Sequence, residues 1–203
     1  VQADHLSAWA DHARAALQQV TTVQGHSHAD VPWLLAGISE GVELLPSLAA
    51  GAGPGLAGLV MMAGSGLDPR DAGQMQAERL GHTADWAALG RAQAGPGADT
   101  QVVQGRSLRY WRDLWQWPVQ QPLLQGPWPV LHAWGDADDM VPPPICEKVA
   151  CLAQPPHAPY CALRLAGANH GLQAGEVDGV RLVWAAVEGG GRAPGRGLCA
   201  SVT

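Results

Sequence analysis

The chain has 203 residues, of which 47% are hydrophobic and 15% are charged. This length is enough for one well-buried core but short for two independent domains, so the composition indicates a single globular domain. Twelve basic residues stand against eighteen acidic ones, which gives a net charge of −6. A chain with this balance lacks the basic surface that phosphate backbones require, so we expect no nucleic-acid partner.

Pro, Gly or a charge interrupts every apolar run before it reaches the roughly 18 residues of a membrane span, so no span is predicted. The first ten residues have neither a basic start nor an apolar signal core, and no targeting segment is predicted. The compartment is left open, with a slight preference for the cytoplasm. Four cysteines are too sparse for a disulfide framework and lack the spacing of a zinc site. We interpret all four, Cys146, Cys151, Cys161 and Cys199, as mostly structural thiols. A disulfide among the first three of them is left open.

Taken in chain order, the pattern of apolar residues predicts helices and strands that alternate. Helical spacing with Ser7 as a possible N-cap predicts a surface helix over Ser7–Val20. Helical spacing also predicts helices over Val42–Ala50 and Val177–Glu188. Short apolar runs predict four buried strands, Val31–Ile38, Leu56–Ala63, Val130–Trp134 and Tyr160–Leu165. Strands separated by helices indicate the α/β class, with a parallel sheet covered by helices on both faces.

The spacing of these elements predicts one domain over residues 1–188, with residues 67–127 inserted as a helical cap and residues 189–203 as a loose tail. In the cap, Trp111 and Trp115 stand four residues apart on a predicted helix. They could line an acyl pocket, but packing against each other is the simpler interpretation. Nearby arginines are expected to form the solvated face of that helix: Arg106, Arg109 and Arg112.

The sequence Gly37-Ile38-Ser39-Glu40-Gly41 lies where the first predicted strand ends and a helix begins. A sharp strand-to-helix turn would hold Ser39 in strained backbone geometry, and side chains at the two flanking glycines would collide with neighbouring elements. Such a turn lifts the serine hydroxyl above the sheet and aims the amide of Glu40 and the following helix at a developing oxyanion. The simpler interpretation is an ordinary glycine-rich turn.

Two further loops follow predicted strands and carry the groups that a serine nucleophile needs. Residues 134–142 contain Asp136, Asp138 and Asp139 directly after the third strand, although each could instead cap the next helix. His170 follows the fourth strand. Parallel sheets place their sites at the carboxyl ends of strands, so we expect Ser39, one aspartate and His170 to meet there.

His26, His28 and Asp30 alternate in a polar loop and could bind a divalent metal. Two histidines and one aspartate in a loop lack a defined fourth ligand and supporting hydrogen bonds, so a solvated loop is the preferred interpretation and no metal site is predicted.

The turn around Ser39, the 135–142 loop and Asn169-His170 resemble the α/β-hydrolase superfamily, in particular its bacterial esterase and serine-peptidase-like branch, over residues 31–188. The resemblance implies Ser39 as nucleophile, His170 as general base and acid, and an aspartate that orients the imidazole. In the family pattern the acid stands three residues after a glycine and three before a valine, which selects Asp138 between Gly135 and Val141, with Asp139 second and Asp136 third.

The chain departs from the family pattern in two places. Val42 stands where the family has a further small residue after the second glycine of the turn. The family's second oxyanion donor follows an earlier strand, and we expect that strand and three others to be missing, which gives a partial α/β-hydrolase fold. The predicted function is a cofactor-independent serine hydrolase that cleaves a small-molecule carboxylic ester or related acyl bond. The alternatives are acyl transfer to another acceptor, and a non-catalytic or truncated fragment with an incomplete oxyanion hole.

The same departure predicts that the strand around Trp33–Ala36 forms an edge of the sheet. An apolar edge strand without a lysine or an inward-pointing charge is a template for pairing with another chain. We therefore expect self-association through this edge.

Overall fold

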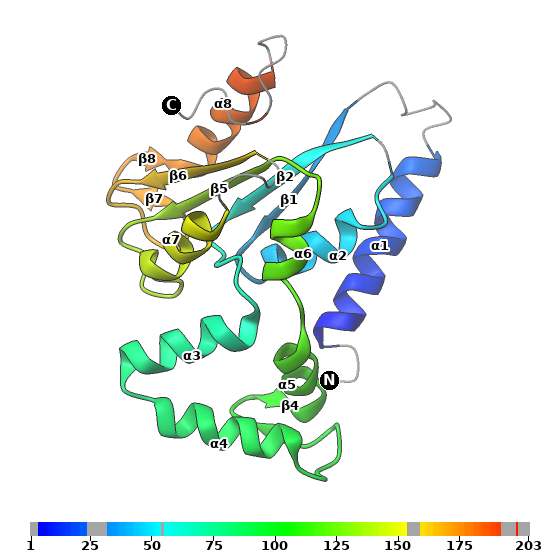
Figure 1. Cartoon of the computed structure of the whole chain (residues 1–203), viewed down its shortest axis with the longest axis vertical. Coiled ribbons are helices and arrows are strands. Elements are labelled where there is room, and N and C mark those ends of the chain that lie inside the picture. Colours follow the sequence, from blue (N-terminus) through cyan, green and yellow to red (C-terminus); the bar gives the residue numbers. More distant parts are fainter. Residues whose placement is uncertain (1–3, 24–31, 54, 154–158, 192–197, 199–203) are drawn as a thin grey trace. The chain divides into compact units, whose positions relative to one another are not determined.

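The structure is a computed structural model, and it describes residues 4–23, 32–53, 55–153, 159–191 and 198. The chain divides into two compact units (Figure 1). One comprises Val1–Gly25 and Asp68–Val119, and the other comprises His26–Leu67 and Gln120–Thr203. The predicted extent of the domain and of the cap insertion stays a prediction.

The second unit contains a four-stranded parallel sheet. In sheet order the strands are β1 (Trp33–Ile38), β2 (Leu56–Met62), β5 (Val130–Gly135) and β6 (Tyr160–Leu165). Neighbouring strands pair in parallel throughout. All four carboxyl ends therefore lie at one edge of the sheet, as the sequence predicts, and each strand agrees with its predicted range within two residues.

Helices cover both faces of this sheet, which confirms the predicted fold class. On one face, core residues of the strands pack against Val183 of α8 (Gly179–Gly191). On the other face, Met61, Leu123 of α6 (Gln120–Gln125) and Val149 of α7 (Pro143–Leu152) meet around Gly66. Figure 1 shows α8 and α7 on opposite sides of the sheet. The apolar burial on both faces explains why the strand sequences show little alternation.

The segments that follow the strands differ from the predicted helices at two places. The predicted helix Val42–Ala50 is a 3₁₀ turn, η2 (Ser39–Leu44), followed by a short α2 (Leu45–Ala49). The predicted start of the last helix is instead a small antiparallel hairpin of β7 (Gln173–Ala174) and β8 (Val177–Asp178).

At the carboxyl end, α8 runs through the three glycines of residues 189–191, and Leu198 is buried at 8% exposure against the sheet core. The loose tail predicted for residues 189–203 stays a prediction, since most of that segment lies outside the described residues.

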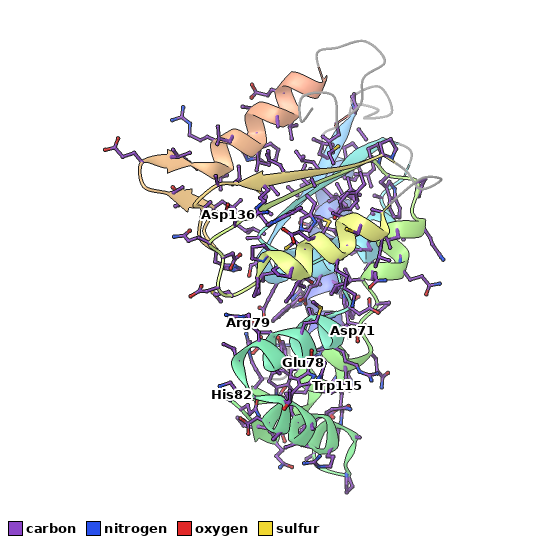
Figure 2. The ribbon with its side chains drawn as sticks, turned by 60° about the vertical axis from the view of Figure 1, so that its left-hand side comes forward. Asp71, Glu78, Arg79, His82, Trp115 and Asp136 are labelled. Atoms are coloured by element: carbon purple, nitrogen blue, oxygen red, sulfur yellow. The ribbon has the colours of Figure 1, made fainter. Side chains whose placement is uncertain are left out.

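The first unit is helical, with α1 (Leu6–Val23), α3 (Pro69–Leu80), α4 (Thr83–Ala94), a small hairpin of β3 (Val102–Val103) and β4 (Arg106–Ser107), and α5 (Leu108–Gln116). Trp86 of α4 stacks on Trp115 of α5 at 4.7 Å between ring centroids and meets Trp111 edge-on at 6.5 Å. Figure 2 labels Trp115 among these helices. A Cβ at Gly73 would lie 2.3 Å from the Trp86 ring. This arrangement supports packing, the simpler of the two interpretations of the Trp111–Trp115 pair.

The prediction that the arginines of α5 form a solvated face is wrong for Arg112. Its guanidinium donates hydrogen bonds to the carbonyl oxygens of Gln93 in the last turn of α4 and of Gly95 and Gly97 just beyond it, and it pairs with the carboxylate of Asp99. The last carbonyls of a helix have no partners within the helix, and the fork of a guanidinium supplies several donors at once. Arg106 also has a partner, because its guanidinium stacks 4.7 Å over the tyrosine ring of α5.

The cysteines divide into two states. Cys146 is buried and free, and Cys151 is exposed and free, whereas Cys161 is disulfide-bonded. A disulfide among the first three cysteines is therefore excluded. Among the described residues, no helix combines the length and the apolar character needed to cross a membrane.

A buried polar set lies within the sheet, and the apolar pattern of the strands does not indicate it. The ring of His132 on β5 is fully buried, with Nε2 2.7 Å from the carbonyl oxygen of Gly64 and Nδ1 2.5 Å from the hydroxyl of Tyr160. Because a carbonyl can only accept, Nε2–H donates to it and Nδ1 accepts the tyrosine proton. Burial lowers the pKa of His132 to about 4, so the ring is neutral at pH 7.

We predict that His132 makes the protein less stable as the pH falls from 7 to 5. The unfolded chain binds a proton on this histidine near pH 6.5, whereas the folded chain does so only near pH 4. Its contribution is complete above pH 6.5 and is lost progressively down to about pH 4. Urea unfolding at the two pH values should show a loss about 2 kcal/mol larger than in His132→Asn, which still offers a donor but does not titrate. Equal losses in the two proteins would contradict the assignment.

We also expect self-association through β1, which forms one end of the sheet order. Within the described part of the chain, no strand pairs with its outer edge, and Ala36 is exposed on it. Light scattering after size-exclusion chromatography should detect dimers or larger species at micromolar concentrations. Ala36→Lys should shift the protein toward monomer, because a charge on an edge strand opposes pairing, whereas Ala87→Lys on exposed α4 should not. A monomeric wild type refutes this expectation.

Candidate active site

Ser39 begins the turn that follows β1 and has a φ of 53°. This left-handed conformation is uncommon for residues other than glycine and is held only where the surrounding structure enforces it. A Cβ at Gly37 would lie 2.6 Å from the carbonyl oxygen of Gly41, so the chain can fold back this tightly only with glycine at position 37. The backbone therefore has the tight strand-to-turn geometry that the sequence predicts.

Two details of that prediction are wrong. A Cβ at Gly41 would meet no described atom within 4 Å, so no neighbouring element demands glycine there. Its backbone matters instead, because it is the group that approaches Gly37. The element that follows is a six-residue 3₁₀ turn and a five-residue helix, too short to supply the expected helix dipole.

The carboxylate of Asp138 is held in a fixed orientation in the loop after β5. Its side chain is fully buried, and Oδ1 accepts the backbone N–H groups of Met140 and Val141, each at 2.9 Å. These bonds leave Oδ2 facing His170. A carboxylate just before a turn can bond the amides that follow it, and Asp138 does so here.

His170 joins the loop after β6 to both other groups. Its Nδ1 lies 2.9 Å from Oδ2 of Asp138, and its Nε2 lies 2.9 Å from Oγ of Ser39. The ring is 21% exposed, so one side is open to solvent. Because a carboxylate can only accept, Nδ1 carries the proton and the lone pair of Nε2 faces the serine hydroxyl.

The other two aspartates of the loop lie elsewhere. Asp139 is exposed, and Oδ1 of Asp136 accepts the N–H of Gly167 at 2.5 Å. Figure 2 labels Asp136 where β5 ends. Asp136 therefore ties the β5 loop to the β6 loop, a role that the sequence did not indicate. Of the three carboxylates, Asp138 is the one that bonds the histidine.

The backbones of the same two loops touch. A Cβ at Gly135 would lie 2.0 Å from the carbonyl oxygen of Ala168, and that oxygen accepts the N–H of Ala137 at 3.0 Å. In the β6 loop, the side-chain oxygen of Asn169 accepts the N–H of Gly171 at 2.9 Å. The imidazole thus stands on a loop that is bonded both internally and to its neighbour.

Glu43 lies in the same six-residue turn as Ser39. Burial, and to a lesser degree the neighbouring carboxylate of Glu40, raises the pKa of Glu43 to about 8. At pH 7 the side chain is therefore mostly protonated. Because the protonated carboxyl is neutral, it adds no negative charge to this turn, where such a charge would oppose an oxyanion.

Among the described residues, no group of three histidine, cysteine or acidic side chains is placed to hold a metal ion. His26, His28 and Asp30 lie outside the described residues, so the preference for a solvated loop there stays a prediction.

No protein-family model matches the chain, and no curated protein matches it. Several solved structures do match the chain. Est1E from Butyrivibrio proteoclasticus aligns with a TM-score of 0.60 at 17% identity, over 85% of this chain and 65% of that chain. The esterase domain of a Rhodothermus marinus protein gives 0.54 at 20%, over 91% and 70%. The monoacylglycerol lipase of Paleococcus ferrophilus gives 0.52 at 16%, over 88% and 74%.

The chain has the α/β-hydrolase fold, as the resemblance implies. It spans about two thirds to three quarters of the length of these three structures. Ser39, Asp138 and His170 occupy the carboxyl ends of three strands of that fold, where parallel sheets carry their sites.

Proposed function

We propose that the protein is a serine hydrolase that cleaves a carboxylic ester, or a related acyl bond, through an acyl-enzyme. One observation carries the proposal: the His170 ring bonds Ser39 Oγ through Nε2 and Asp138 Oδ2 through Nδ1, each at 2.9 Å. A nucleophile in contact with a base, itself oriented by a third group, is the arrangement that nucleophilic catalysis needs.

In the proposed reaction, Ser39 Oγ attacks the acyl carbon while Nε2 of His170 takes the hydroxyl proton. The backbone N–H of Glu40 donates to the oxyanion that forms. His170 then gives the proton to the departing oxygen, the bond between that oxygen and the acyl carbon breaks, and the acyl group stays on Ser39. A water molecule, deprotonated by the same imidazole, releases the acid and restores the serine.

Asp138 orients the imidazole in this scheme and stabilises its protonated form. Its backbone hydrogen bonds to residues 140 and 141 hold the carboxylate still while the proton moves. No step of the scheme uses a metal or an organic cofactor.

The names of two structural neighbours, an esterase domain and a monoacylglycerol lipase, support an ester as the scissile group. The proposed substrate is a small-molecule ester or acyl compound. Transfer of the acyl group to an acceptor other than water uses the same residues, and analysis of the products in the presence of added alcohols distinguishes the two.

The alternative is a chain that carries these residues but lacks part of the oxyanion site. The chain covers 65–74% of the length of these neighbours. Loss of one oxyanion donor costs about 2.7–4 kcal/mol in comparable sites, so turnover would fall at least about 100-fold below that of a complete relative.

We predict that a fluorophosphonate probe modifies Ser39 and no other serine. Peptide mapping by mass spectrometry should place the adduct there, and Ser39→Ala should abolish labelling. Ser65→Ala is the matched control, because Ser65 is buried and its hydroxyl accepts the N–H of Leu67. An adduct on Ser65 or Ser107, or labelling of the Ser39 variant, refutes the nucleophile assignment.

We predict that Asp138→Asn lowers turnover by about 10³ to 10⁴, the loss expected when the orienting carboxylate of such a site becomes an amide. The amide oxygen can keep the bonds to the backbone, which turns the NH₂ group toward Nδ1 and favours the wrong tautomer. Asp139→Asn and Asp136→Asn should lose less. Circular dichroism must show all three variants folded. A larger loss for Asp139→Asn would overturn the choice of Asp138.

A further inference from the structure

Val42 departs from the family pattern, and the structure shows where its side chain goes. It is buried at 1% exposure and lies over the backbone just beyond β2. A Cβ at Gly64 would lie 2.6 Å from both Cβ and Cγ2 of Val42. Real Cβ atoms do not approach so closely, so the two positions share space for a single side chain.

The Gly64 peptide against which Val42 packs is held firmly. Its carbonyl oxygen accepts the Nε2–H of His132 at 2.7 Å and the thiol of Cys146 at 3.6 Å. Just before it, Ala63 is fully buried with a φ of 50°, and its N–H bonds the carbonyl of Ala133 at 2.9 Å. Bonds from β5 and α7 therefore fix the surface on which Val42 rests.

Tyr160 of β6 completes this support. Its hydroxyl donates to Nδ1 of His132, which sets the tautomer that offers Nε2–H to the Gly64 carbonyl. The pKa of His132, lowered to about 4 by burial, keeps the ring neutral and this pattern of donors unchanged at pH 7.

We propose that Gly64 is a positioning residue for Ser39 and that it acts through Val42. The inference rests on the proposed function, because it concerns the reactivity of the same serine. Val42 and Ser39 belong to the same six-residue turn, η2, so a displacement of Val42 is transmitted to Ser39 through three residues of tightly folded backbone. A side chain at position 64 would push Val42 away and move the turn, and with it Oγ from its 2.9 Å contact with His170.

A role for Gly64 in positioning Ser39 and a role in general packing predict different results when side chains are changed at positions 42 and 64. If the two positions share one space, a side chain is tolerated at either position but not at both. The restriction to small residues that the family shows after the second glycine of the turn is met here at position 64 instead.

The test measures the second-order rate constant for fluorophosphonate labelling of Ser39 in the full chain. Four variants are compared with the wild type: Gly64→Ala, Val42→Gly, the double variant, and Gly51→Ala as control. A Cβ at Gly51 would come no closer than 3.9 Å to the nearest described atom. All rates are taken below the midpoint of thermal unfolding of every variant.

We expect Gly64→Ala to slow labelling at least about 10-fold, since displacements near 1 Å have large effects on rate. The double variant should label at least about 10-fold faster than the product of the two single effects. The shape of the pH profile should not change in any variant, because the contact between His170 Nδ1 and Asp138 Oδ2 is kept and only the serine is displaced. Gly51→Ala should label like the wild type.

Labelling of Gly64→Ala at the wild-type rate would overturn the inference while leaving the proposed function intact. Additive losses in the double variant would overturn it too. If Gly64→Ala alone folds poorly, the double variant should regain folding and labelling, and a double variant that is no better folded than Gly64→Ala would overturn the inference. A wild type that never labels would refute the proposed function, and the inference with it.

Discussion

The site depends on one contact, the approach of the backbone at Gly135 to the carbonyl of Ala168. With 2.0 Å between that oxygen and the place of a Cβ, any other residue at position 135 would force the loops after β5 and β6 apart. The N–H of Ala137 and the carboxylate of Asp136 then bond the β6 loop. His170 and Asp138 face each other because the loops that carry them cannot separate.

The same edge of the sheet holds backbone strain. Three residues other than glycine adopt left-handed conformations there: Ser39 after β1, Ala63 after β2 and Leu172 after β6. Such conformations cost on the order of 1–3 kcal/mol each and persist only where packing and hydrogen bonds enforce them. Ala63 and Leu172 are fully buried, so their surroundings supply that enforcement. Strain gathered where the loops meet means that packing and hydrogen bonds hold these residues in one arrangement.

The sequence predicts the strands and their order of succession because buried parallel strands have a strong apolar signal. It predicts the meeting of Ser39, an aspartate and His170 because strand ends of a parallel sheet share an edge. It misses η2, because over six residues the spacing of apolar residues in a 3₁₀ turn cannot be distinguished from that in an α-helix. It also misses the contacts of Arg112, because three of its partners are backbone carbonyls at and just beyond a helix end, which leave no trace in side-chain spacing.

The roles of His132 and Gly64 cannot be predicted from one segment of the sequence, because their partners lie in other segments. A histidine within an apolar strand looks like an exception until Gly64 and Tyr160, from two other strand neighbourhoods, satisfy both ring nitrogens. Burying a polar ring is costly unless both nitrogens have partners, so the three residues form a set. Val42 likewise looks like an exception to the family pattern, which has a small residue at this position, as long as only the residues of the turn are compared. The volume it needs is provided by a residue beyond the next strand, which a pattern confined to the turn cannot include.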